Sequence, residues 1–326
     1  MRIVLDAMGS DTCPEPEVEA AVQAAKKWGD PILLVGRKNE LEPKVAALQP
    51  EPGLVEIIHA PEVFQMTDKP ARTARKKATS SMAVGMDLLK ENKADAFVTA
   101  GNTGGALVNA IFRLGRIRGV KRPALSPAVP VATGTAIVVD VGANTDCKPD
   151  YLLQFAKLGS LYANKVQGIP KPRVGLLSNG EEEGKGNQLV KDTFPLLKNS
   201  NLNFIGNVEP KEVFAGEADV VVTDGFYGNI LIKSSEAVAK FLVEIIKEQI
   251  QAGVATSIGG LLAKPAFKRV FAVLDPAEYG GAPLLGVQGI VFVGHGRSDA
   301  RALVNAIGQA RKAVENKLLE AMQAGI

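Results

Sequence analysis

The sequence predicts an α/β protein in which helices cover a mostly parallel β-sheet. Short runs of β-branched and other apolar residues alternate along the chain with longer segments that carry apolar residues at helical spacing. Strands that alternate with helices in this way form βαβ units, which place helices over a parallel sheet. Several strand runs are apolar at every position, as strands buried on both faces should be. With 326 residues, of which 46% are hydrophobic, the chain can bury a sizeable core.

The individual elements follow from this periodicity. The predicted strands are short β-branched runs, at residues 3–6, 32–35, 55–59, 96–99, 136–140, 174–178, 204–205, 220–223 and 290–293. The predicted helices are longer amphipathic segments, at residues 16–28, 72–91, 103–114, 151–166, 187–198, 229–251 and 299–324. No flexible linker separates them, so we expect residues 1–326 to be one unit, either one large domain or two interlocked lobes. The proline-rich residues 123–130 are the best candidate for a crossing between lobes.

A helical hairpin is predicted near residues 252–275. Large apolar residues there surround Lys264, Lys268 and Arg269, and Pro265 divides the segment into two short helical pieces. Such a hairpin suits an anionic membrane surface or the cover of an acyl tunnel. The alternative is an ordinary buried helix pair at a dimer interface.

Two segments of the chain, 124 positions apart, have similar sequences. Residues 94–107 and 218–231 are identical at seven of fourteen positions, and each copy reads as a strand, a glycine-rich loop and a helix start. Glycine lets a ligand approach N–H groups at a helix N-terminus, where the helix dipole favours negative charge. Two such loops after parallel strands predict one cleft that holds an anion, although any strand–helix joint favours glycine. The candidate binding residues in the loops are Gly101, Asn102, Thr103, Gly104, Asp224, Gly225, Gly228 and Asn229.

Polar residues at the predicted strand ends have two interpretations each. Asp6, Asp140 and Asp224 each end a strand-like run at the edge where α/β sites form, and each can equally serve as a loop or helix cap. Asn102 and Asn229 can donate an N–H group to a carbonyl or phosphate oxygen. The alternative is that each caps the helix that follows it.

Several kinds of catalytic site lack their residues in this sequence. His59 and His295 are the two histidines present, too few for a multi-histidine metal site and little material for a histidine-based triad. Neither a Gly-x-Ser-x-Gly elbow nor a Gly-x-Gly-x-x-Gly dinucleotide fingerprint occurs. Residues 180–186 partly match a nucleotide phosphate loop, but the segment is one residue too short, and its three glutamates would repel a nucleotide. The net charge of +3 is too small to predict a nucleic-acid partner.

The remaining inventory consists of glycine loops, asparagines, a few acids and lysines. It suits a reaction in which the substrate brings its own nucleophile, and inorganic phosphate is such a substrate because it is largely anionic near neutral pH. If the electrophile is a thioester, the leaving thiolate needs little help from an acid. The protein then has to hold phosphate, polarise the acyl carbonyl and stabilise an oxyanion.

Motifs along almost the whole chain resemble those of the bacterial phosphate acyltransferase family, PlsX. They are Asp6-Ala7-Met8-Gly9 with Asp11, Arg75-Lys76-Lys77, Ser80-Ser81-Met82, Ala100-Gly101-Asn102-Thr103-Gly104, Asp140-Val141-Gly142-Ala143-Asn144, Lys185-Gly186-Asn187, Gly206-Asn207-Val208-Glu209, Thr223-Asp224-Gly225-Phe226, Gly228-Asn229, Tyr279-Gly280-Gly281-Ala282 and His295-Gly296. The sequence departs from the family's usual pattern at Ser10, Thr12, Tyr227 and Arg297.

The resemblance implies a three-layer α/β/α fold related to isocitrate and isopropylmalate dehydrogenases and to phosphate acetyltransferases. It implies transfer of a long-chain fatty acyl group from acyl carrier protein to inorganic phosphate, without a cofactor or metal. The acyl-phosphate would feed phosphatidic acid synthesis through a glycerol-3-phosphate acyltransferase. A cytoplasmic homodimer, peripherally associated with the inner face of the membrane, is also implied.

The resemblance also assigns roles to single residues. It points to Lys185 and Asn229 as catalytic, because both stand within matching motifs; without it, Lys185 reads as a solvated turn lysine. The substrate-binding residues expected beside the two repeated loops are Asp6, Gly9, Asn144 and His295.

Two basic clusters are candidates for docking the acidic acyl carrier protein, with solvated helix faces as the alternative. The first is Arg72, Arg75, Lys76 and Lys77, and the second is Arg113, Arg116, Arg118, Lys121 and Arg122. Three other functions remain open: a short-chain phosphate acyltransferase that uses coenzyme A, an oxidoreductase of the isocitrate dehydrogenase type, and a non-catalytic scaffold at the membrane surface. The oxidoreductase is disfavoured because a metal-binding Asp cluster and a nucleotide pocket are not evident.

Overall fold

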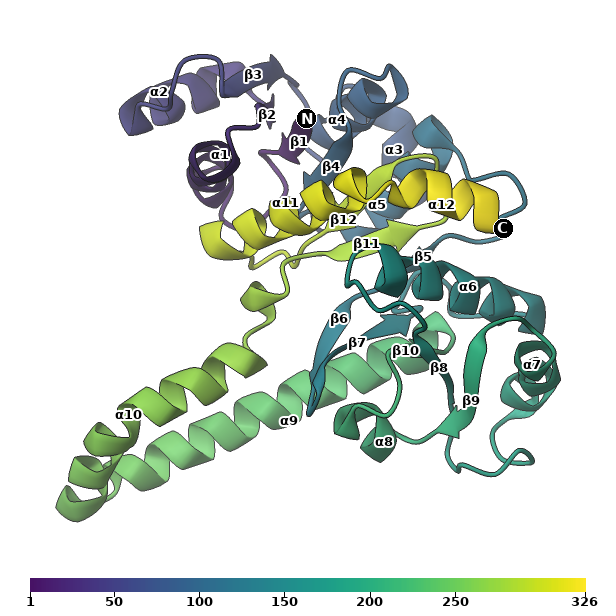
Figure 1. Cartoon of the computed structure of the whole chain (residues 1–326). Helices are drawn as coiled ribbons and strands as arrows, with labels where there is room; N and C mark the ends of the chain where they lie inside the picture. Colours follow the sequence, from purple (N-terminus) through teal and green to yellow (C-terminus); the bar gives the residue numbers. More distant parts are fainter.

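The chain forms two β-sheets that lie side by side, each packed against helices (Figure 1). The structure is a computed structural model, which describes the backbone of residues 1–326 and every side chain except that of Pro276. The first sheet has the strand order β3-β2-β1-β4-β12-β11-β5, and the second has the order β6-β7-β10-β8-β9. Most neighbours are parallel; the antiparallel pairs are β12 with β11, β11 with β5, and β6 with β7.

The bounds of most strands agree closely with the predicted apolar runs, but β9 is longer than predicted, and β5, β6 and β11 were not predicted. The first sheet contains β1 (Ile3–Asp6), β2 (Ile32–Gly36), β3 (Val55–His59), β4 (Ala96–Thr99), β5 (Ala124–Leu125), β11 (Ala282–Leu285) and β12 (Ile290–Val293). The second contains β6 (Ala128–Val131), β7 (Gly134–Val139), β8 (Arg173–Leu177), β9 (Asn203–Val208) and β10 (Val220–Val222).

The helices connect consecutive strands, except α11 and α12, which follow the last strand. They are α1 (Glu15–Trp28), α2 (Lys38–Leu48), α3 (Pro70–Lys76), α4 (Ser81–Lys90), α5 (Thr103–Asn109), η1 (Ala110–Leu114), α6 (Pro149–Lys165), α7 (Gln188–Lys198), α8 (Pro210–Ala215), α9 (Gly225–Gln251), α10 (Val254–Leu274), η2 (Pro276–Glu278), α11 (Ala300–Glu315) and α12 (Leu318–Gly325).

Each sheet is the middle layer of a three-layer arrangement, as predicted. In the first sheet, alternate residues such as Leu5 and Val4 point to opposite faces, with α1 and α11 packed on one face and α4 on the other. In the second sheet, Val139 packs toward α6, whereas Val138 belongs to the cluster on the opposite face beside α8. One cluster of buried residues runs across both sheets and includes α6 and α12, which contact each other.

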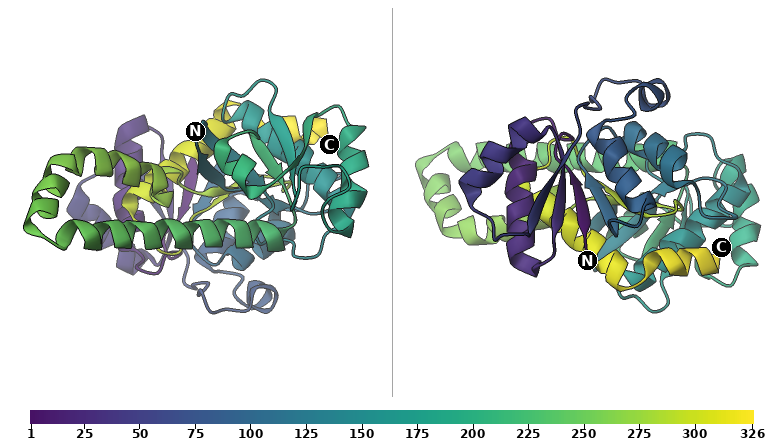
Figure 2. Two further views of the ribbon diagram at one scale, coloured as in Figure 1. Left: turned by 90° about the horizontal axis from the view of Figure 1, so that it is seen from below. Right: turned by 90° about the horizontal axis from the view of Figure 1, so that it is seen from above.

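The chain crosses from the first sheet to the second between β5 and β6. β5 and most of β6 lie within residues 123–130, the segment predicted for the crossing between lobes. The chain returns through α9 and α10, an antiparallel hairpin that extends away from both sheets (Figures 1 and 2). No residue of α10 is buried, and the buried residues of α9 are Gly225 and Gly228 at its first turn.

Several predicted elements differ from the structure. The helix expected at 72–91 is two helices, because Ser80 caps α4 through a hydrogen bond from Ala83 N to Ser80 Oγ. The helix expected at 299–324 is also two, α11 and α12, since Lys317 adopts a left-handed conformation between them. The division at Pro265 was wrong: α10 runs through this proline, and the hairpin turns instead near residues 252–253, between α9 and α10.

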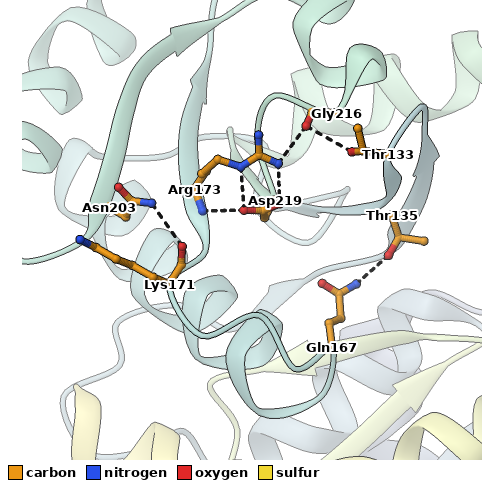
Figure 3. A network of polar contacts seen from close by, with 8 residues as sticks. All are labelled: Thr133, Thr135, Gln167, Lys171, Arg173, Asn203, Gly216 and Asp219. Atoms are coloured by element: carbon orange, nitrogen blue, oxygen red, sulfur yellow. Dashed lines mark hydrogen bonds and ion pairs between the residues drawn. The ribbon is translucent and has the colours of Figure 1, made fainter.

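A polar network closes the second sheet at the edge opposite the carboxyl ends of its strands (Figure 3). The guanidinium of Arg173, at the start of β8, donates from Nε and Nη2 to the carboxylate of Asp219 at 3.0 and 2.8 Å. Burial acts to raise the pKa of Asp219, but the hydrogen bonds from Arg173 outweigh it and hold the pKa below its usual value. Nη2 of Arg173 also donates to the carbonyl of Gly216, which accepts from Thr133 as well. This network holds the loop before β10 in place at the amino ends of the strands. The carboxyl ends of the strands, on the opposite side, carry the loops of the candidate site.

Candidate functional site

A cavity of about 1800 Å³ lies between the two sheets and the α9–α10 hairpin. It receives the loops that follow the carboxyl ends of parallel strands, which is where α/β proteins bind ligands. From the first sheet it is lined by Gly101, Thr103 and His295, and from the second by Asp224, Asn229 and their neighbours. The two repeated loops therefore contribute to one hollow, although they belong to different sheets.

The loop after β1, which contains Gly9, lies directly against the first copy of the repeat. A Cβ atom on Gly9 would lie 2.9 Å from the backbone nitrogen of Gly101, so only glycine permits this contact. Beneath them, Thr99 donates its hydroxyl to Oδ2 of Asp6 at 2.7 Å. Asp6 is buried, and burial raises its pKa. Asp6 and Gly9 thus support the floor of this loop, and neither lines the cavity.

Asn102 and Gly104 hold the first copy of the repeat in place. The carbonyl oxygen of the Asn102 side chain caps α5 by accepting from Gly105 N at 2.9 Å, and its Nδ2 donates to the Met66 carbonyl at 2.8 Å. A Cβ on Gly104 would lie 2.6 Å from the ring of Pro70. The capping interpretation of Asn102 therefore describes its contacts in the structure, whereas Gly101 and Thr103 face the cavity.

The second copy of the repeat packs against the loop after β7. Asp224 caps α9 by accepting from Tyr227 N at 2.8 Å, and burial is the main cause that raises its pKa. Cβ atoms on Gly225 and Gly228 would lie 2.7 Å from the carbonyl oxygen of Asn144 and 2.0 Å from that of Asp140, so both glycines permit close backbone contact.

Asp140 and Asn144 form one hydrogen-bonded unit behind this contact. Oδ2 of Asp140 accepts from the backbone and side-chain nitrogens of Asn144 at 2.7 and 3.0 Å, and Oδ1 accepts from Leu125 N at 2.8 Å. Burial raises the pKa of Asp140 to about 6 despite these bonds. Nδ2 of Asn144 also donates to the Pro123 carbonyl, so its amide is engaged in the protein rather than directed at a ligand. The unit ties the second sheet to the crossing segment.

The two predicted catalytic residues take different positions. Asn229 is the fifth residue of α9 and lines the cavity, and since Asp224 is the cap, the capping interpretation of Asn229 is wrong. Lys185 is exposed in the loop before α7, with its stem over Gly180, where a Cβ would lie 2.7 Å from Cγ of the lysine. It is next to the lining residues Gly186 and Asn187 but does not itself line the cavity.

His295 lies at the first-sheet side of the cavity, opposite α9. Its pKa is lowered, mainly by burial and next by the positive charge of Arg297, and Lys233 on α9 acts in the same direction. Its Nδ1 accepts from Arg297 N at 3.4 Å. The imidazole is therefore neutral near pH 7 and can exchange a hydrogen bond with a substrate.

Several residues that line the cavity were not predicted from the sequence. Ser178 and Asn179 follow β8, and Lys233 and Glu236 lie on the third turn of α9. The position of residues 178–179 at the end of a predicted strand was the available signal. The carboxylates of Glu181, Glu209 and Glu212 also gather outside the cavity, but each pairs with the ammonium of Lys211 at 2.8–3.1 Å.

Solved structures define the class of fold. The chain is similar to the EutD phosphotransacetylase from Staphylococcus aureus, with a TM-score of 0.62 and 16% identity, over 97% of this chain and 94% of that one. It is also similar to a branched-chain phosphotransacylase from Enterococcus faecalis (TM-score 0.60, 14% identity, 96% and 99% covered). A 4-hydroxythreonine-4-phosphate dehydrogenase from Klebsiella pneumoniae matches with a TM-score of 0.57 at 14% identity, over 96% of this chain and 98% of that one. The predicted dehydrogenase-like α/β/α fold is thereby confirmed.

Sequence comparison then gives the family. The model of the fatty acid synthesis protein family matches residues 1–321. The chain is 46% identical to a phosphate acyltransferase from Pelotomaculum thermopropionicum over 100% of its length and 95% of the relative's. It is 48% identical to a phosphate acyltransferase from Acidobacterium capsulatum, with 98% and 96% covered. The chain belongs to the phosphate acyltransferase (PlsX) family, and the predicted acyltransferase activity toward phosphate is supported at this level.

Proposed function

We propose that this chain transfers a long-chain acyl group from acyl carrier protein to inorganic phosphate, giving an acyl-phosphate for phosphatidic acid synthesis. The observation that carries the proposal is the shape and lining of the cavity. Its polar end holds the loops around Asn229 and His295, and its other end lies under apolar residues of the hairpin, including Leu242, Ile246 and Val270. A volume of about 1800 Å³ exceeds the roughly 300–1,000 Å³ of a typical small-molecule site, as a long acyl chain would require.

The reaction needs few protein groups. An oxygen of monohydrogen phosphate attacks the thioester carbonyl carbon, the carbon–sulfur bond breaks, and the phosphate proton ends on the departing thiolate. The side-chain amide of Asn229 can donate to the carbonyl oxygen as it gains negative charge, and the ammonium of Lys185 can stabilise the phosphate or the same oxyanion. Neutral His295 is a candidate to relay the proton.

The basic clusters support docking of the acidic acyl carrier protein. Arg113 and Lys121 are ion-paired with Asp87 and Asp150, so they are partly neutralised. The guanidinium of Arg75 lies 5.8 Å from the centre of the Phe112 ring, so the first cluster lies next to the start of the second at residues 112–113. The basic side chains of the two clusters that have no carboxylate partner among the described residues are Arg72, Arg75, Lys76, Arg116, Arg118 and Arg122.

Charge reversal tests this dock. Replacing Arg116 and Arg118 by Glu should raise the KM for the acyl carrier protein substrate, because the attraction that speeds encounter becomes repulsion. Reversing Lys26 and Lys27, which are exposed on α1, applies the same change of charge elsewhere. An equal effect of both pairs, or none, would argue against this surface as the dock.

The cellular setting follows from the same proposal. We infer a cytoplasmic homodimer that contacts the membrane peripherally through the α9–α10 hairpin, and a glycerol-3-phosphate acyltransferase as the consumer of the product. In the part of the chain that the structure describes, no helix combines the length and apolar character needed to cross a bilayer. The exposed apolar residues of the hairpin support surface contact instead, and they include Val254, Ile258, Leu261 and Leu262.

One assay tests the central proposal. The protein is incubated with phosphate and either palmitoyl-acyl carrier protein or acetyl-coenzyme A, and free thiol and acyl-phosphate are measured. We expect product from the long-chain donor alone. Preference for acetyl-coenzyme A would identify a short-chain phosphate acyltransferase, and release of no thiol from either donor would contradict catalysis and favour the scaffold.

A further inference from the structure

We propose that the phosphate substrate binds at the N-terminus of α7, where the hydroxyl of Ser178 faces Gly186. The inference rests on the proposed function and assigns a place to one of its substrates. Around the cavity, α5, α7 and α9 present their N-termini, and the structure distinguishes them by what already occupies each one.

The N-terminus of α9 is occupied by a carboxylate. Asp224 accepts from Tyr227 N at 2.8 Å, so an arriving phosphate would meet negative charge at the place where the dipole would otherwise attract it. Helix α5 has seven residues, and the side-chain amide of its cap, Asn102, donates to backbone carbonyl groups of residues 65–68. Neither end is well suited to an anion.

The N-terminus of α7 differs in both respects. Its cap is the neutral Asn187, which accepts from Val190 N at 3.0 Å and adds no charge. The helix has 11 residues, and Gly186, Asn187, Leu189 and Val190 line the cavity. The N–H groups of the first turn ahead of Val190 are therefore left for a ligand.

Ser178 is an independent sign of a ligand at this end. Ser178 is 9% exposed and lines the cavity, yet its Oγ has no hydrogen-bond partner among the described residues. A Cβ on Gly186 would lie 3.2 Å from this Oγ, so the hydroxyl is directly beneath the loop that starts α7. A buried hydroxyl without a partner costs free energy, which a phosphate oxygen that accepts from Ser178 Oγ would recover. The N–H of Gly186 already donates to Asn179 Oδ1 at 3.0 Å, so the phosphate would use the N–H groups that follow it in the first turn of α7.

The surrounding charges permit an anion here. Glu181 and Glu183 of the preceding loop pair with Lys211 and Lys198 at 3.1 and 2.9 Å. Lys185, in the same loop, has no carboxylate partner among the described residues. Asn207 Nδ2 donates to the Glu182 carbonyl at 2.9 Å and so holds the loop over the site.

The site also lies next to the candidate catalytic residue. β8 and β10 are parallel neighbours in which Leu176 pairs with Val222, so Ser178 and Asp224 leave the sheet side by side. Neighbouring strands are about 4.8 Å apart. Phosphate at the start of α7 is thereby placed beside the first turns of α9, where Asn229 would hold the acyl carbonyl.

The test compares two buried serines. Ser178→Ala should raise the KM for phosphate about tenfold, leave the KM for the acyl donor unchanged, and reduce the rise in melting temperature that phosphate causes without donor. Ser126→Ala is the matched control, because Ser126 Oγ is also buried without a partner among the described residues but does not line the cavity. We expect it to match the unaltered protein in all three measurements.

A second variant at the same position tests the proposal if Ser178→Ala does not fold. Ser178→Cys keeps the volume with a weaker donor and should raise the KM for phosphate less. An unchanged KM for phosphate, or a rise in the KM for the donor alone, would overturn the site; the latter would indicate the donor's own phosphate group. If the protein forms no acyl-phosphate but phosphate still stabilises it in a Ser178-dependent way, the proposed function fails and the site stands.

Discussion

Gly228, on the first turn of α9, lies so close to the loop after β7 that a Cβ atom on it would be 2.0 Å from the carbonyl oxygen of Asp140. No side chain fits at that distance, so α9 starts where it does because residue 228 is glycine. Asn229 is the next residue, and its position in the cavity depends on this contact.

Gly228→Ala should therefore displace the start of α9. We expect a loss of about 1–3 kcal/mol in the free energy of unfolding, as for other overpacked sites, together with reduced turnover. Gly259→Ala in α10 is the control, because a Cβ atom on Gly259 would meet nothing within 4 Å and alanine is the better helix former. Normal turnover and normal melting of Gly228→Ala would contradict the close contact.

Asn229→Ala tests the oxyanion role separately from stability. The side chain does not cap α9, so its removal should leave the unfolding free energy nearly unchanged while kcat falls about 10²–10³-fold, as when one oxyanion donor is lost. Asn316→Ala, which removes the Nδ2 bond to the Lys312 carbonyl at the end of α11, should leave kcat intact. A variant at residue 229 that loses stability and activity in proportion would instead indicate a structural role.

Lys185→Ala tests the ammonium beside the cavity. The exposed side chain covers little besides Gly180, so we expect the melting temperature to stay constant and acyl-phosphate formation to fall severely. Lys191→Ala, an exposed lysine on α7, removes a similar charge close by. Equal turnover of the two variants would exclude a specific role for Lys185.

Much of the fold could be predicted from single segments. Runs such as Val220–Val222 are apolar throughout because both faces of the strand are covered, and this leaves a local signal. The strands β5 and β11 contain two and four residues and pair antiparallel, so they exist through tertiary pairing that no local pattern encodes. For the same reason, the sequence left open whether the strands form one sheet or two lobes, although it indicated residues 123–130 as the crossing. At Pro265, exposure on α10 lets water satisfy the carbonyl that the proline leaves free.

The sequence predicted where the site lies better than which residues line it. The repeat identified two loops that share one cavity, because glycine is required wherever backbones approach closely. The repeat did not distinguish Gly101 and Asn229, which line the cavity, from Asn102, whose amide bonds to the protein. Asn144, which the family resemblance indicated, likewise bonds to the protein. Ser178 was missed because a single serine after a strand carries no signal until its burial and unmatched hydroxyl are known.

Glu17 predicts a pH dependence of stability. Its carboxylate is buried at the start of α1, and Oε1 accepts from Ser10 N at 2.9 Å. Burial is the main cause that raises its pKa from 4.5 to about 7, and the nearby charge of Asp6 acts in the same direction. Between these pH values the folded protein binds the proton more tightly than the unfolded chain. The stabilisation is therefore complete below pH 4.5 and is lost as pH rises through 7.

Glu17→Gln should remove this dependence, because the amide keeps the acceptor for Ser10 N and never ionises. We expect the variant to gain on the order of 3 kcal/mol over the unaltered protein at about pH 8.5 and little at about pH 4.5, in unfolding titrations at both pH values. Glu19→Gln, on the exposed side of α1, should shift neither curve. A constant difference between Glu17→Gln and the unaltered protein across the range would show that Glu17 does not titrate there.

Leu261→Glu tests membrane contact through the hairpin. Leu261 and Leu262 are 69% and 78% exposed on α10, and such large apolar side chains gain free energy when a lipid surface covers them. A glutamate at position 261 replaces this gain with the cost of desolvating a charge and repels anionic headgroups. We expect less protein to float with vesicles of anionic lipid, and no change for Leu48→Glu, a control on α2 where Leu48 is 45% exposed. Equal flotation of both variants and the unaltered protein would place membrane contact on another surface.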